Sequence, residues 1–201
     1  MKYKIRRFDY YSKDYLNMFY NILYPLKKDR IAKYVKDDKK LSSITGEIIL
    51  DELLKENYKT NYEELEFLVN ENGKPYINNK PIFYNISHSY QYVIAIVSDY
   101  EVGVDIEKIR TTSIDSINQF ATDKEKEYIL SGNDDIYKRL FEIYTLKEAY
   151  FKMKGTNLNH IKEVQFEIKT YNDISCSDNS VSLKLIDDLE GYIIAICEDK
   201  Y

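Results

Sequence analysis

The sequence predicts an α+β protein made of two similar α/β halves packed as an intramolecular pseudo-dimer. The first observation is an internal repeat, because YVIAIVSD at 92–99 recurs as YIIAICED at 192–199 with five of eight positions identical. The second is that a helical pattern and then strands precede each copy. Chance likeness is the alternative, since buried strands draw on few residue types. We expect the halves at residues 1–103 and 104–201.

In the first half we expect one strand, then three helices, then a series of strands. A local net charge of +4 marks the second of its helices, because the stretch 27–40 holds seven Lys or Arg against three Asp. An Asn-Gly pair at 72–73 predicts a tight turn between two short strands. The expected elements are a strand at 3–8, helices at 12–23, 27–35 and 43–57, strands at 66–69 and 76–77, and a hairpin over 85–108.

In the second half, helices precede strands. Ile143, Leu146, Tyr150 and Met153 recur at helical spacing and form the apolar stripe of a long helix, for which Gly155 is the expected C-cap. The expected elements are helices at 114–120, 123–131 and 137–154 and strands at 164–169, 181–185 and 192–198.

Composition narrows the class of protein. The 201 residues are 44% hydrophobic, which fits a folded chain with a substantial core. No apolar run approaches the roughly 20 residues that span a bilayer, and the N-terminus lacks a secretory signal. The net charge of −5 argues against a nucleic-acid surface. We expect a cytoplasmic protein that binds neither nucleic acid nor membrane, with Cys176 and Cys197 as reduced thiols.

Two carboxylates stand one residue apart in GVDIE. Asp105 and Glu107 are at i and i+2 of an expected strand, so both leave one face while Val104 and Ile106 face the core. At about 7 Å and an effective dielectric near 20, their repulsion is roughly 2 kcal/mol, which favours a nearby cation or proton. Oxygen ligands select a hard ion such as Mg²⁺. The alternative is a solvated strand end.

A third acid lies on the long helix. Glu148 is nearly opposite the apolar stripe, so it faces either bulk water or a polar cleft. Lys152 follows at i+4 and Lys147 stands beside it. The alternative is an ordinary i,i+4 surface ion pair between Glu148 and Lys152, worth a few tenths of a kcal/mol.

Four ordered motifs extend the pattern: GKP at 73–75, NISHS at 85–89, GVDIE at 103–107 and KEAYFK at 147–152. Together they resemble the 4'-phosphopantetheinyl transferases of the large, pseudo-dimeric surfactin-synthetase-activating type over most of the chain. The resemblance implies transfer of phosphopantetheine from coenzyme A to a serine of an apo acyl or peptidyl carrier protein. Release of adenosine 3',5'-bisphosphate and Mg²⁺ dependence are implied with it, and the internal pseudo-dimer favours a working monomer.

The resemblance also implies roles for the acidic and lysine side chains. Asp105, Glu107 and Glu148 would hold Mg²⁺ against the pyrophosphate. Either Glu148 or Lys152 would help deprotonate the incoming serine, and Lys152 could equally stabilise phosphate charge. Two rival readings are a metal-dependent phosphodiesterase that activates water, and a non-catalytic module that binds coenzyme A or a carrier protein.

Coenzyme A contacts follow from the same resemblance. In the loop before the buried strand, Ser87 and His88 would contact phosphates, so that one hairpin frames a single diphosphate. The remaining contacts would come from Lys74 near the nucleotide, Lys27 and Arg30 on one helix face at the 3'-phosphate, and a hydroxyl from Ser43. A hydrogen-bonded core histidine and solvated lysines are the alternatives. Two departures from the family are Tyr144, where tryptophan is usual, and Ser42, where arginine is common.

Overall fold

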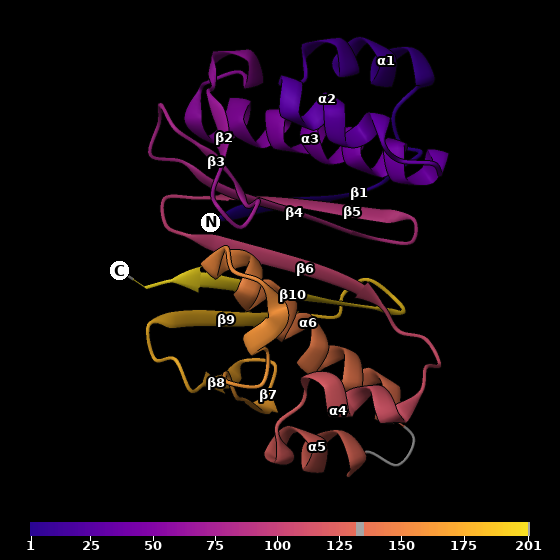
Figure 1. The fold of residues 1–201 in the computed structure, drawn as a ribbon, viewed down its shortest axis with the longest axis vertical. Helices are drawn as coiled ribbons and strands as arrows, with labels where there is room; N and C mark the ends of the chain where they lie inside the picture. Colours follow the sequence, from indigo (N-terminus) through magenta and orange to yellow (C-terminus); the bar gives the residue numbers. More distant parts are fainter. Residues whose placement is uncertain (132–134, 201) are drawn as a thin grey trace. The chain divides into compact units, whose positions relative to one another are not determined.

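The chain forms two compact units, Met1–Asp99 and Tyr100–Tyr201, in a computed structural model that describes residues 1–131 and 135–200 (Figure 1). Each unit combines a three-stranded antiparallel sheet with one long helix on that sheet. The boundary expected after residue 103 would leave Val102 and Gly103 with unit 1. Both belong to β6 (Val102–Lys108), which pairs with the last strand of unit 2.

Unit 1 has the sheet order β1-β5-β4, with α3 against the sheet. Helix α3 begins at Asp37, six residues earlier than expected. Asp37 and Asp38 in its first turn favour a helix N-terminus, although that turn carries no apolar signal. The elements are β1 (Lys2–Arg7), α1 (Lys13–Ile22), α2 (Pro25–Ala32), α3 (Asp37–Tyr58), η1 (Tyr62–Glu64), β2 (Phe67–Val69), β3 (Pro75–Ile77), β4 (Phe83–Ser89) and β5 (Tyr92–Ser98).

Unit 2 has the sheet order β6-β10-β9, with α6 against the sheet. Gly155 ends α6 at φ 64°, which confirms the expected C-cap. One strand, β8, was not predicted. Besides β6, the elements are η2 (Ile114–Ser116), α4 (Ile117–Phe120), α5 (Asp123–Leu130), α6 (Ile136–Lys154), η3 (Leu158–His160), β7 (Phe166–Thr170), β8 (Asp173–Cys176), β9 (Val181–Ile186) and β10 (Tyr192–Asp199).

The repeat in the sequence is a repeat of the fold. Its two copies, β5 and β10, are the central strands of the two sheets, and the same strand order surrounds them (Figure 1). The register also agrees, because Ala95 stands opposite Lys4 on β1 while Ala195 stands opposite Asp105 on β6. Lys4 and Asp105 are therefore equivalent positions. The prediction of two similar α+β halves is confirmed.

The stretch 85–108 is not one hairpin, contrary to expectation. β4 and β5 form a hairpin, but β6 pairs with β10. The reason is that β1 and β4 already occupy both edges of β5, which leaves no edge for a further strand. Residues 85–89 are also part of β4 rather than a loop. His88 and the carboxylates of GVDIE thus belong to different sheets.

In the described parts of the chain, no helix is both long enough and apolar enough to cross a bilayer. Cys176 and Cys197 carry free thiols, as expected.

Candidate active site

The backbone of α6 rests directly on β6 at Gly103. A Cβ at this position would lie 2.0 Å from the carbonyl oxygen of Ala149 and 2.5 Å from the amide nitrogen of Met153. Only glycine permits that approach. Since side chains alternate along a strand, Asp105 and Glu107 share the helix-facing side with Gly103.

This placement corrects the expectation that, of these β6 side chains, only Val104 and Ile106 face the protein interior. Val104 and Ile106 point to the side away from α6, and they are fully buried as well. The core cluster of unit 2 includes residues of α6 and Ala195, which pairs with Asp105. The two carboxylates therefore face the helix and not a solvated strand end.

Asp105 is almost completely buried, with 3% of its surface exposed. The Nζ of Lys152 donates a hydrogen bond to its Oδ1 over 2.6 Å, and the two groups form an ion pair. The sequence reading had offered Glu148 as the surface partner of Lys152. The structure shows an ion pair that instead joins the helix to the strand.

Glu148 lies one turn before Lys152 and accepts a hydrogen bond from the hydroxyl of Tyr144 at 2.7 Å. The Tyr144 ring packs edge-on against Phe120, with ring centroids 5.3 Å apart. Burial, with a smaller contribution from the charge of Asp105, raises the pKa of Glu148 above its usual range. The sequence marks Tyr144 only as a departure from the tryptophan that is usual in the family.

The electrostatic surroundings of the Tyr144 phenol include all three acids. Burial contributes most to the raised pKa of its phenol, followed by the hydrogen bond and charge of Glu148 and by the charges of Glu107 and Asp105. The acids that the sequence singled out thus lie in the same part of unit 2, two on the α6-facing side of β6 and one on α6.

Glu107 has a partner that the sequence reading missed. The guanidinium of Arg110 donates to Glu107 Oε2 at 3.1 Å and lies over the Phe141 ring, 4.7 Å from its centroid. Arginine three residues after an acid, just beyond the strand, was the only signal available in the sequence.

Lys147, which adjoins Glu148 in the same motif, has a structural role. Its side chain is fully buried between α5, α6 and the segment before β7. The ammonium contacts Glu125 Oε2 at 2.9 Å and donates to the carbonyl oxygens of Ile161 at 2.8 Å and Val164 at 2.6 Å.

The donor chemistry of the carboxylates fits Mg²⁺, which prefers oxygen ligands. Within residues 1–131 and 135–200, however, no three or more Asp, Glu, His or Cys side chains are gathered closely enough to hold a metal ion. Instead, an internal donor holds each acid: Lys152 for Asp105, Arg110 for Glu107 and Tyr144 for Glu148.

In unit 1, Lys27 of α2 points inward. Its Nζ lies 2.6 Å from Glu47 Oε1, and Glu47 is 1% exposed and also accepts from the hydroxyl of Tyr62 at 3.0 Å. Arg30, one turn later, is exposed and donates from Nε to the hydroxyl of Tyr34. Of the two residues expected at a phosphate, Arg30 therefore has the accessible side chain.

Ser43 and His88 lie at one end of unit 1. Thr45, near Ser43 on α3, donates to the carbonyl of Phe8 at 3.1 Å, and the amide of Phe8 donates to Gln91 in the β4–β5 turn. His88 lies next to that turn and is exposed, whereas Ser43 is buried.

Ser87 and His88 project from opposite faces of β4, because neighbouring strand residues alternate. The expectation that both side chains contact one ligand from a single loop is therefore not supported by their geometry. Lys74 follows Gly73 in the β2–β3 turn, where Gly73 adopts φ 83° and the amide of Lys74 donates to Asn70 Oδ1 at 2.8 Å.

These features define a two-unit α+β protein in which a strand and a helix of unit 2 present three carboxylates and a lysine. Residues 11–100 match the family model of the 4'-phosphopantetheinyl transferase N-terminal domain, and residues 101–197 match that of the 4'-phosphopantetheinyl transferase superfamily. The chain belongs to the 4'-phosphopantetheinyl transferase superfamily.

Two relatives illustrate the similarity. The chain is 31% identical over 133 residues to the 4'-phosphopantetheinyl transferase gsp of Aneurinibacillus migulanus. This match covers 66% of this chain and 56% of gsp. The chain is also 23% identical over 187 residues to the 4'-phosphopantetheinyl transferase Sfp of Bacillus subtilis, which covers 89% of this chain and 83% of Sfp. The chain thus spans just over half the length of gsp and most of Sfp.

Proposed function

We propose that the chain transfers the 4'-phosphopantetheine group of coenzyme A to a serine of an apo acyl or peptidyl carrier protein and releases adenosine 3',5'-bisphosphate. The observation that supports this proposal best is that Asp105 and Glu107 face α6, the helix that carries Glu148, in a chain of this superfamily. We also propose that it acts in the cytoplasm as a monomer.

In this reaction the serine oxygen forms a bond to the β-phosphorus of coenzyme A, and the bond from that phosphorus to the bridging oxygen breaks. Asp105, Glu107 and Glu148 would hold Mg²⁺, which when bound neutralises charge on the pyrophosphate. Catalysis of this kind depends mainly on positioning and charge. The close seating of α6 on β6 at Gly103 would keep the helical and strand acids in register.

The serine must lose its proton, and Glu148 is the better acceptor. Its carboxylate has lone pairs that can accept the proton, and in the metal-free chain burial raises its pKa. In the metal-free chain Lys152 is ion-paired with Asp105, and a lysine ammonium has no lone pair to accept a proton whether it is paired or not. We therefore assign Glu148 as the base and leave Lys152 to stabilise phosphate charge.

Unit 1 would supply the contacts to the nucleotide. The exposed side chains of Arg30 and His88 suit phosphate oxygens, and Lys74 and Ser43 are further candidates. Lys27 would have to leave Glu47 to join them, and Ser87 would contribute from the opposite strand face. Arg30→Ala should raise the KM for coenzyme A with little change in kcat, since its contact is not made at the reacting atoms.

The test is incubation with coenzyme A, Mg²⁺ and a panel of apo carrier proteins, followed by intact-mass measurement. We expect one carrier to gain a single phosphopantetheine on serine, and Asp105→Ala and Glu148→Ala to abolish the gain while circular dichroism stays unchanged. Binding of coenzyme A without any mass gain would instead support a binding module. Release of adenosine bisphosphate without a carrier would indicate a phosphodiesterase.

A further inference from the structure

Lys152 occupies the position of a counter-ion among the acids of unit 2. Its ammonium is 2.6 Å from Asp105, which is buried, and its charge also acts on Glu148. Two carboxylates facing one helix repel each other, so the metal-free protein gains from a cation held there. Lys152 supplies that cation from within the chain.

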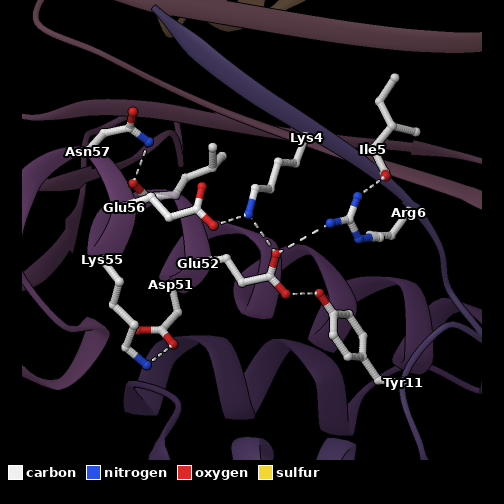
Figure 2. A network of polar contacts seen from close by, with 10 residues as sticks. Lys4, Ile5, Arg6, Tyr11, Asp51, Glu52, Lys55, Glu56 and Asn57 are labelled. Atoms are coloured by element: carbon white, nitrogen blue, oxygen red, sulfur yellow. Dashed lines mark hydrogen bonds and ion pairs between the residues drawn. The ribbon is translucent and has the colours of Figure 1, made fainter.

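The equivalent position in unit 1 shows the same arrangement with the charges exchanged. Figure 2 shows Lys4, the counterpart of Asp105, donating to Glu52 at 3.1 Å and to Glu56. Glu52 and Glu56 are one turn apart on α3, as Glu148 and Lys152 are on α6.

In both units a tyrosine hydroxyl also donates a hydrogen bond to a glutamate of the long helix. Tyr11 donates to Glu52 at 2.5 Å (Figure 2). Likewise, Tyr144 donates to Glu148 at 2.7 Å. In both units a lysine ammonium therefore fills the polar contact between the first strand and the long helix. Strand and helix supply opposite charges in both units, but only in unit 2 does the strand supply the carboxylates, which are the proposed metal ligands.

We propose that Lys152 is an internal counter-ion that leaves Asp105 when a divalent cation binds, so that the lysine and the cation exclude each other at this carboxylate. The proposal rests on the metal site of the proposed function and extends it. The Lys152 ammonium becomes available to a phosphate only after the cation is in place. Metal binding would therefore precede the phosphate contact of this lysine.

The first test compares two variants of the same helix by calorimetric titration with Mg²⁺ or Mn²⁺, without coenzyme A or carrier protein. Lys152→Met should bind either ion about tenfold more tightly than the natural chain, which corresponds to about 1.4 kcal/mol. Lys154→Met is the matched control, because Lys154 is two residues away, pairs with Asp178 at 3.0 Å and loses the same charge. It should change affinity less than about twofold.

Unchanged or weaker binding by Lys152→Met would show that the lysine does not compete with the cation and would overturn the proposal. An equal gain in both variants would indicate a general effect of net charge and would overturn it as well.

The second test uses the natural chain and does not depend on the folding of a variant. An amine-reactive reagent, with peptide mass spectrometry, measures the labelling rate of Lys152 with and without Mg²⁺. We expect Mg²⁺ to accelerate labelling of Lys152 severalfold and to leave Lys154 unchanged. Equal rates at Lys152 would mean that the lysine stays on Asp105. Transfer activity without this exchange would refute only the counter-ion role, whereas exchange without transfer would refute only the proposed reaction.

Discussion

Gly103→Ala tests how α6 is held against β6. The added Cβ would lie 2.0 Å from the carbonyl oxygen of Ala149 and 2.5 Å from the amide nitrogen of Met153. Non-bonded carbon contacts are favourable at about 3.5–4.0 Å, so the helix must move away by more than about 1 Å. Overpacking costs about 1–3 kcal/mol, and backbone atoms cannot relieve it by rotation, so we expect a loss of about 3 kcal/mol in unfolding free energy.

The same movement should impair catalysis. Glu148 and Lys152 lie on α6 whereas Asp105 lies on β6, and a misplacement of 1 Å can cost about 100-fold in rate. Urea unfolding followed by circular dichroism measures the stability, and the initial rate of carrier modification measures the transfer.

Gly46→Ala is the matched control in unit 1. There the added Cβ would lie 2.6 Å from the Cγ2 methyl of Ile86, so that side chain must shift, and the next neighbour is at 3.4 Å. The clash involves a side chain rather than backbone atoms, and replacing a helical glycine by alanine gains up to about 1 kcal/mol, so the net loss should be smaller than for Gly103→Ala. If Gly103→Ala were as stable and as active as Gly46→Ala, the close seating of α6 on β6 would be refuted.

Three further predictions concern unit 2. Tyr144→Phe should lower the transfer rate about tenfold with an unchanged fold, since Glu148 loses one hydrogen bond; a normal rate in steady-state kinetics would contradict this. Lys147→Met should lower the unfolding free energy, measured by urea unfolding, by about 3–5 kcal/mol, because Glu125 stays buried without its cation. A smaller loss in the double variant Lys147→Met/Glu125→Gln would confirm this cause. In a chelating buffer, Glu148→Gln should stabilise the protein at pH 7, because the raised pKa of Glu148 means that deprotonation of this side chain favours the unfolded chain. The gain in unfolding free energy should vanish below pH 4.5. A gain that persisted at that pH would exclude this cause.

Local pattern predicted most of the fold. The repeat located the two central strands, and alternation in GVDIE correctly placed Asp105 and Glu107 on one face. The pattern did not predict the start of α3, because a helix turn of charged residues has no apolar period. The expected hairpin over 85–108 failed because strand order depends on which edges are already filled.

The sequence singles out the residues of the candidate site but not the contacts that they make. The acids stand out by type and spacing, but the partner of each depends on how α6 crosses β6. That crossing is set by Gly103, a residue whose importance appears only when a helix backbone is found against it. Arg110 and Tyr144 were missed as partners for the same reason, since hydrogen bonds between side chains of different elements leave no periodic trace.

The two units show how one scaffold can support different electrostatics. Register makes Lys4 and Arg6 of β1 equivalent to Asp105 and Glu107 of β6. In unit 1 the basic strand satisfies acids of α3 directly, as the contacts of Lys4 and Arg6 with Glu52 show (Figure 2). A divalent cation placed there would meet two positive side chains, whereas at β6 it meets two negative ones. The sign of two strand residues therefore separates a structural ion-pair network from a candidate metal site, although helix, sheet order and register are shared.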